Sequence, residues 1–99
     1  MGYIYKITNK TDGKIYIGQT IQSLEERFRQ HRKKGSNCRY LKRAFEKYGF
    51  DNFVFEMICI CFDDDLDKFE IQYMTKFNSI VPNGYNLRAG TRLAETALR

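Results

Sequence analysis

The stretch that most constrains the fold is YIYKITNKTDGKIYIG, residues 3–18. Two runs of tyrosine, isoleucine and other strand-forming residues flank a polar centre. That centre ends in Asp12-Gly13, a dipeptide typical of tight hairpin turns. We therefore expect two strands, over residues 2–8 and 14–18, joined by a turn. Gly18 is predicted to end the second strand.

Helix signals follow the hairpin. Ser23 and Glu26 form the S-x-x-E pattern of a capping box, which predicts a helix from about Leu24 to Lys34, ended by Gly35. Similar signals predict a second helix, capped by Ser36 or Asn37, that runs through Tyr48 and ends at Gly49. A strand is then predicted over residues 53–62, and a third helix from the acids of residues 63–65 to about Phe77. A turn at residues 82–84 leads into a short last segment, residues 85–88.

This order, β-β-α-α-β-α, predicts an α+β fold with a small central antiparallel three-stranded sheet flanked by helices. With 99 residues, of which 42% are hydrophobic, the chain can build one modest core. We expect residues 1–90 to form a single domain. Residues 91–99 carry little pattern, and we interpret them as a C-terminal tail or as the stub of a longer protein.

Composition favours a soluble intracellular protein. No window reaches the apolar length of a membrane span, and the N-terminus lacks the apolar region of a signal peptide. The three cysteines are an odd number, and Cys59 and Cys61 lie within an apolar run. They indicate small hydrophobic side chains rather than a disulfide framework.

Charge is distributed unevenly along the chain, whose net charge is +5. Nine lysines and arginines lie between Arg27 and Lys47, against one acid, Glu46. Such a basic region is a common footprint of phosphate-backbone binding, although a solvated helix surface without a partner would look the same. The basic residues that avoid the apolar stripe of the second helix are Arg39, Lys42, Arg43 and Lys47.

Polar residues interrupt two predicted apolar helix faces. Glu70 falls inside the apolar stripe of the third helix, where an isolated carboxylate costs several kcal/mol unless it is paired or bound to a cation. Arg27 and His31 lie one turn apart beside the apolar face of the first helix. Two interpretations remain open here: a buried ion pair between Glu70 and Arg27 or a lysine, or a divalent metal at Glu70 with Arg27 and His31 facing an anion.

These features together resemble the GIY-YIG nuclease domain. The matching features are YIY and YIG in the hairpin, then Arg27 and His31 four residues apart, then Glu70, and then Asn86 in NGYN. The resemblance extends from Gly2 to about Gly90. One position departs from the pattern, because Tyr3 stands where the first motif has glycine. Strand alternation puts Tyr3 on the same face as Tyr5, so its ring could narrow the cavity.

The resemblance implies a role for each matched residue. Tyr5 would act as the general base or orient the attacking water, and Tyr16 would bind phosphate or water. Arg27 would bind the scissile phosphate, while His31 would contact phosphate or assist proton transfer. Glu70 would be the single protein ligand of the metal, and Asn86 would hold the site together through backbone hydrogen bonds. Apart from the resemblance, the pattern of basic residues predicts that Arg39, Lys42, Arg43 and Lys47 contact the nucleic-acid backbone, and that Lys14 adds positive charge near the site and contacts the nucleic acid.

The implied function is a metal-dependent DNA endonuclease, of homing type or associated with mobile elements. It would hydrolyse a phosphodiester by water attack and leave 3'-hydroxyl and 5'-phosphate ends. The implied cofactor is Mg2+, with Mn2+ as a substitute, and the partner is double-stranded DNA. The protein would act alone or as a dimer. The alternatives are a catalytically inactive nucleic-acid-binding module and a purely structural ion pair beneath a solvated basic surface.

Overall fold

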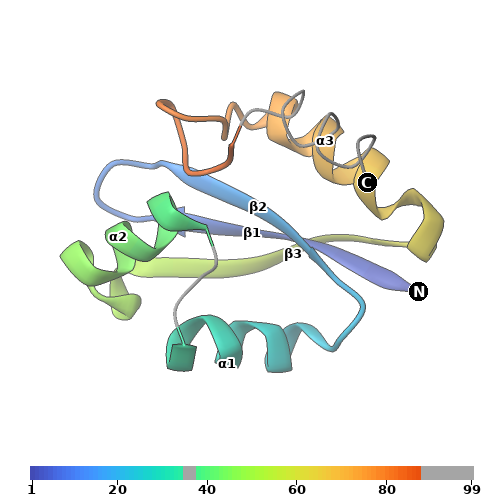
Figure 1. The fold of residues 1–99 in the computed structure, drawn as a ribbon, viewed down its shortest axis with the longest axis horizontal. Helices are drawn as coiled ribbons and strands as arrows, with labels where there is room; N and C mark the ends of the chain where they lie inside the picture. The colour runs from blue at the N-terminus through green and yellow to red at the C-terminus, as the bar shows by residue number, and fades with distance from the viewer. Residues whose placement is uncertain (35–37, 88–99) are drawn as a thin grey trace.

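A three-stranded antiparallel sheet forms the centre of the protein (Figure 1), and this computed structural model describes residues 1–34 and 38–87. The strands and helices are β1 (Gly2–Asn9), β2 (Ile15–Thr20), α1 (Leu24–Lys34), α2 (Arg39–Tyr48), β3 (Phe53–Cys61) and α3 (Leu66–Lys76). Two short 3-10 helices, η1 (Phe50–Asn52) and η2 (Asp63–Asp65), precede β3 and α3. The α+β class, the sheet and the element order are therefore as predicted.

The strand order is β2-β1-β3, and β1 pairs antiparallel with both neighbours. The predicted turn closes the β1–β2 hairpin, with Gly13 at a φ of 76° and its N–H donating to the carbonyl of Asn9. Tyr5 pairs with Gly18, and Ile7 pairs with Tyr16. Because directly opposed residues share a face, Tyr5 and Tyr16 are diagonal neighbours on the same side of the sheet.

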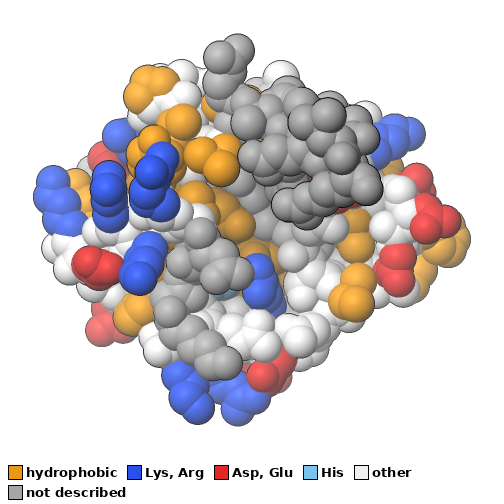
Figure 2. All heavy atoms as spheres, in the orientation of Figure 1, with side chains coloured by type: hydrophobic (Ala, Val, Ile, Leu, Met, Phe, Trp, Pro, Cys, Tyr) orange, Lys and Arg blue, Asp and Glu red, His pale blue; other side chains and the backbone are white. Residues whose placement is uncertain are grey.

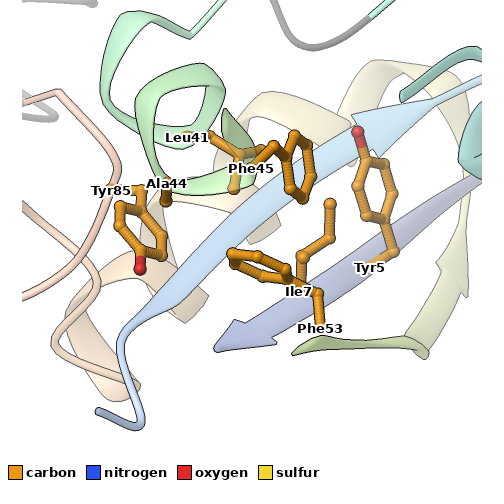
Figure 3. Packing of buried hydrophobic residues seen from close by; sticks show 7 residues of the cluster. All are labelled: Tyr5, Ile7, Leu41, Ala44, Phe45, Phe53 and Tyr85. Atoms are coloured by element: carbon orange, nitrogen blue, oxygen red, sulfur yellow. The ribbon is translucent and has the colours of Figure 1, made fainter. Parts of the chain in front are cut away.

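Each face of the sheet carries its own apolar cluster. On one face, Tyr5 and Ile7 of β1 pack with Leu41, Ala44 and Phe45 of α2, and residues of α1 lie against this cluster. Figure 3 shows Tyr5 at one end of this cluster and Tyr85 at the other. On the opposite face, the cluster comprises Ile4, Ile17, Cys61, Leu66 and Met74, the last two from α3. The sheet therefore separates α1 and α2 from α3 (Figure 1).

Several predicted boundaries were wrong. The second strand continues past Gly18 to Thr20. The N-cap of α2 is Cys38, whereas Ser36 and Asn37 lie outside the described residues. The acids of residues 63–65 form a separate 3-10 helix, so α3 begins at Leu66.

The short last segment predicted over residues 85–88 contains Asn86, which forms a single parallel bridge with Ile80. The predicted tail, residues 91–99, lies outside the described part of the chain. Within residues 1–34 and 38–87, no helix is both long enough and apolar enough to cross a bilayer.

Candidate active site

Tyr5 lies at the centre of the candidate site. Its side chain is fully buried, and its Oη accepts a hydrogen bond from Nε of Arg27 at 3.1 Å. The same oxygen lies 2.9 Å from Nε2 of His31. The Tyr5 ring also packs edge-on against Phe28, with the ring centroids 5.5 Å apart. The first strand and the first helix therefore bring a phenol, a guanidinium and an imidazole together.

His31 is buried and neutral. Only 3% of its surface is exposed, and its ring lies near those of Phe45 and Phe55. Burial, together with the charge of Arg27, lowers the pKa of His31 to about 4. Within the described residues, Nδ1 of this ring has no hydrogen-bond partner. We assign the proton to Nε2, because the other tautomer would bury an N–H group without an acceptor.

Arg27 lies beside both hairpin tyrosines. Burial opposes its charge, but the hydrogen bond to Tyr5 and the proximity of Tyr5 and Tyr16 raise the pKa of Arg27. Its Nη1 also donates to the side chain of Gln30 at 3.4 Å. The ring of Tyr16 lies 6.4 Å from that of Tyr5 and 6.1 Å from that of His31, measured between centroids. Four of the six predicted site residues therefore form one cluster.

Gly18 makes room for the Tyr5 ring. A Cβ atom built on Gly18 would lie 2.3 Å from Cζ of Tyr5 and 2.4 Å from its Oη. No real Cβ atom approaches a ring so closely, so only glycine fits at this point of β2. The glycine of the second motif therefore allows the phenol to lie across the strand. We had interpreted it as the end of the strand.

Asn86 binds the outer edge of β2. Its Oδ1 accepts a hydrogen bond from the N–H of Ile17 at 2.8 Å, and its Nδ2 donates to the carbonyl of Ile17 at 2.9 Å. Ile17 lies between Tyr16 and Gly18, so Asn86 holds the stretch of backbone that carries both. These contacts also satisfy backbone groups on the outer side of β2, which is an edge strand of the sheet formed by the described residues.

Glu70 approaches the same stretch of β2 from the other helix layer. Its side chain is 2% exposed, so the glutamate that interrupts the apolar stripe of the third helix is buried. Asp67, one turn earlier, accepts a hydrogen bond from Gln19 of β2, and Met74, one turn later, packs in the cluster that contains Ile17. Side chains three and four residues apart share a helix side. Glu70 therefore faces β2 close to Ile17.

The hydrogen bonds of Arg27 are not those of the buried ion pair with Glu70 that the sequence allowed as one interpretation. Among the described residues, the ion pairs join Lys6 to Glu56, Arg29 to Glu26, and the N-terminal ammonium to Asp63. Arg27 instead donates to Tyr5 and Gln30.

The donor set near Glu70 suits some metals better than others. Within residues 1–34 and 38–87, no three His, Cys, Asp or Glu side chains gather as a metal site. Zinc and calcium sites normally need such a group of protein ligands. Mg2+ is commonly held by one or two carboxylates, with water and substrate phosphate completing its coordination. A single buried carboxylate therefore fits Mg2+.

The predicted nucleic-acid contacts lie mostly on the outer side of α2. Arg39, Lys42, Arg43 and Lys47 are exposed, opposite the buried Leu41, Ala44 and Phe45. Figure 2 shows lysine and arginine side chains gathered at the left of this view, where Figure 1 places α2. Lys14 is half-buried at the start of β2 and lines a cavity together with Arg43.

Sequence reasoning missed three contributors to the site. Gln30 binds Arg27, Phe55 packs near His31, and Gly18 provides space for Tyr5. The signal for Gln30 was its spacing of three residues from Arg27. For Phe55 no local signal existed, because its role depends on which residues face it across the sheet. Gly18 stands in the YIG motif, but the motif does not show that the Tyr5 ring needs its space.

The burial of His31 predicts acid sensitivity. The unfolded chain takes up a proton at this group near its ordinary pKa of about 6.5, whereas the folded chain does so only near 4. Stability is therefore complete above the unfolded pKa and falls as the pH drops from 6.5 to 4. We expect the protonation of His31 to lower the free energy of unfolding by up to about 3 kcal/mol between pH 6.5 and pH 4.

Urea unfolding at several pH values measures this loss, with His31→Gln as the comparison. The variant should lose less stability between pH 6.5 and 4 than the parent, since carboxylates affect both alike. His31 is the chain's single histidine. Its ring protons therefore report the titration directly by NMR, and a midpoint near 6.5 in the folded protein would contradict the assignment.

The fold and the site motifs define a catalytic-domain class, and the chain belongs to the GIY-YIG catalytic domain family, whose model matches residues 1–86. Its fold is similar to that of the catalytic domain of the homing endonuclease I-TevI. The TM-score is 0.74 at 26% identity, and the match covers 89% of this chain and 99% of that one. A second structure, of the catalytic domain of the intron endonuclease I-TevI, gives a TM-score of 0.70 at 28% identity, over 90% and 96% of the two chains.

Two viral proteins are similar in sequence. Protein 146R of Invertebrate iridescent virus 6 is 43% identical over 60 residues, which are 58% of this chain and 24% of that protein. Protein segB of Enterobacteria phage T4, named as a candidate endonuclease, is 37% identical over 91 residues, which are 89% of this chain and 38% of segB. This chain therefore spans less than half the length of these relatives.

Proposed function

We propose that the protein is a DNA endonuclease that hydrolyses a phosphodiester bond by water attack. The observation that carries the proposal is the Tyr5 hydroxyl, held between Arg27 and His31 at 3.1 Å and 2.9 Å within a GIY-YIG domain. The proposal has three parts: activation of water, stabilisation of the phosphate charge, and binding of the DNA duplex.

Tyr5 is the proposed acceptor of the water proton. With the His31 proton on Nε2, the phenolic oxygen receives two N–H donors, one of them from a guanidinium. Donors that point at an oxygen stabilise negative charge on it. As a base, Tyr5 first gives up its own hydroxyl proton to solvent, and the resulting phenolate, held by the two donors, takes the proton of the attacking water. His31 orients the Tyr5 oxygen rather than acting as an acid at neutral pH.

Arg27 is the proposed phosphate ligand. Its Nε and Nη1 are engaged by Tyr5 and Gln30, which fix the plane of the guanidinium. Within the described residues, Nη2 makes no hydrogen bond, so it can donate to a phosphate oxygen. A positioned guanidinium stabilises the extra negative charge of the phosphoryl transition state. Tyr16, on the same face of the sheet, would donate its hydroxyl to the same phosphate.

Glu70 is the residue that would hold Mg2+. The ion would supply charge neutralisation at the phosphate and at the leaving oxygen. The exposed basic side chains of α2 would contact the duplex backbone and position it without reading its sequence.

The test is cleavage of supercoiled plasmid, with and without Mg2+, by the full chain and by Glu70→Gln. The parent should nick or linearise the plasmid only with the metal present. The variant keeps the shape of the side chain but loses its charge. We expect it to lose nearly all cleavage, because the proposed single protein ligand of the metal has lost its charge.

Asp64→Asn is the matched control, because it removes an exposed acid of η2 and should cut like the parent. Duplex binding without cleavage in Mg2+ or Mn2+ would instead support the inactive binding module. Cleavage by the parent in the presence of a chelator would reject the metal-dependent mechanism.

The homing-type or mobile-element setting is the finer part of the proposal. It is supported by similarity to a homing endonuclease domain and to viral and phage proteins. Sequencing of the ends formed in the plasmid assay tests it, with 3'-hydroxyl and 5'-phosphate ends at a preferred site as the expected result. Dispersed cuts would argue against this setting while leaving the nuclease activity intact.

A further inference from the structure

A cavity lies between α2, the residue before β2 and the segment that follows α3. Its volume is about 450 Å3, within the range of roughly 300–1,000 Å3 that small-molecule sites occupy. The side chains that line it are Lys14, Tyr40, Arg43, Val81, Pro82 and Tyr85. They come from the start of β2, from α2 and from the segment after α3. None of the catalytic cluster of Tyr5, Tyr16, Arg27 and His31 lines it.

One wall of the cavity is rigid. Tyr85 is buried and accepts a hydrogen bond from Nδ2 of Asn9 on its hydroxyl at 2.9 Å. Its backbone N–H donates to the carbonyl of Ile15 at 3.0 Å, and its own carbonyl accepts from the thiol of Cys38 at 3.0 Å. The ring lies beside Ala44 of α2 (Figure 3). This side of the cavity is therefore preformed.

The opposite wall is aromatic and basic. Tyr40 is half-buried in the first turn of α2, and the guanidinium of Arg39 lies over its ring, 5.1 Å from the centroid. Lys14 and Arg43 add two cations, and the described lining residues include no acid. A phosphate is attracted by the cations, whereas the tyrosine, valine and proline side chains suit a flat apolar group.

A nucleotide has both of these groups, a phosphate and a flat base. In a paired duplex the bases are stacked inside, so the duplex offers this cavity phosphates but no base face. A base turned out of the stack offers both, and proteins commonly hold such bases against aromatic and apolar side chains. The cavity is joined to β2, the strand that carries Tyr16, by the hydrogen bond from the backbone N–H of Tyr85 to the carbonyl of Ile15.

We propose that this cavity binds one unstacked nucleotide of the DNA substrate, with its base against Tyr40 and Tyr85 and its phosphate at Lys14 and Arg43. The proposal rests on the proposed DNA-binding function. It extends that function by giving the protein a preference for DNA in which one nucleotide is unpaired.

The test is fluorescence anisotropy of labelled DNA with the full chain in a chelator, so that no DNA is cut. Three duplexes are compared: fully paired, with one unpaired extra thymidine, and with an abasic residue at that extra position. The parent should bind the thymidine bulge about tenfold more tightly than either of the others, since one base stacked on an aromatic ring contributes about this factor. The abasic duplex separates base binding from simple backbone flexibility.

Tyr40→Ala should lose this preference while still binding the fully paired duplex, which also shows that it is folded. Tyr48→Ala is the matched control, because Tyr48 is likewise half-buried in α2 beneath a basic side chain, that of Lys47 at 5.2 Å, but does not line the cavity. It should keep the preference. Equal binding of the thymidine and abasic bulges, or an unchanged preference in Tyr40→Ala, would overturn this proposal alone. Failure of the parent to bind any of the three duplexes would overturn the DNA-binding function as well.

Discussion

Replacing Tyr5 by phenylalanine is expected to lower the cleavage rate on the order of a thousandfold while leaving the fold intact, since removal of a positioned general base has effects of this size. The substitution removes one oxygen and keeps the ring that packs against Phe28 and Ile7. Nε of Arg27 and Nε2 of His31 then lose their common partner. The cost in stability should be about 1–3 kcal/mol, because buried polar groups are left unsatisfied.

Tyr3→Phe is the matched control for this experiment. Tyr3 lies two residues earlier on β1, on the same face of the sheet, and is half-buried. It should lose little activity if the effect belongs to the Tyr5 hydroxyl. Initial cleavage rates at saturating Mg2+, together with thermal unfolding, measure both properties. A Tyr5→Phe rate within a few-fold of the parent would leave the proposed activation of water without its base.

Replacing Gly18 by alanine is expected to damage both folding and activity. The added Cβ would meet Cζ and Oη of Tyr5 at 2.3 Å and 2.4 Å. The Tyr5 ring lies in a packed cluster, so it can move only by straining its neighbours. We expect a loss of about 1–3 kcal/mol from overpacking. Cleavage should fall as far as in Tyr5→Phe, because the displaced hydroxyl leaves Arg27 and His31.

A second substitution separates this clash from a general effect of alanine in a strand. In a Tyr5→Leu background the ring end is gone, so Gly18→Ala should cost much less stability there than in the parent. Urea unfolding of the four proteins gives this coupling as a double-mutant cycle. Equal costs in both backgrounds would show that the ring is not what excludes a side chain at Gly18.

Much of the site could be predicted from the sequence, although its arrangement could not. Arg27 and His31 were placed on one helix side by their spacing, and Glu70 was identified by its position inside an apolar stripe. Both statements depend only on helix periodicity. The hydrogen bonds of Arg27 and His31 to Tyr5 depend on how α1 lies over the sheet, and no local pattern encodes that geometry.

Two predicted element boundaries were wrong, the strand end at Gly18 and the helix start at residues 63–65. Gly18 was interpreted as a strand end because glycine generally weakens strands, yet here the Tyr5 ring occupies the space that a side chain would take. The acids of residues 63–65 suit a helix N-terminus, but the chain makes a 3-10 turn there, and Asp63 pairs with the N-terminal ammonium. At Gly18 a contact between segments distant in sequence prevailed over local preference, whereas a 3-10 turn is a frequent start of an α-helix.

By itself, the sequence determined the α+β class and the order of the strands and helices and indicated candidate site residues, because binary patterning, turn residues and motif spacing act over a few neighbouring positions. Only the tertiary structure decided that Tyr5 receives two donors, that His31 is buried neutral, and that Tyr40 and Tyr85 face one cavity. These properties depend on desolvation and on distances of a few ångströms between segments far apart in the chain, and both exist only once the layers have packed.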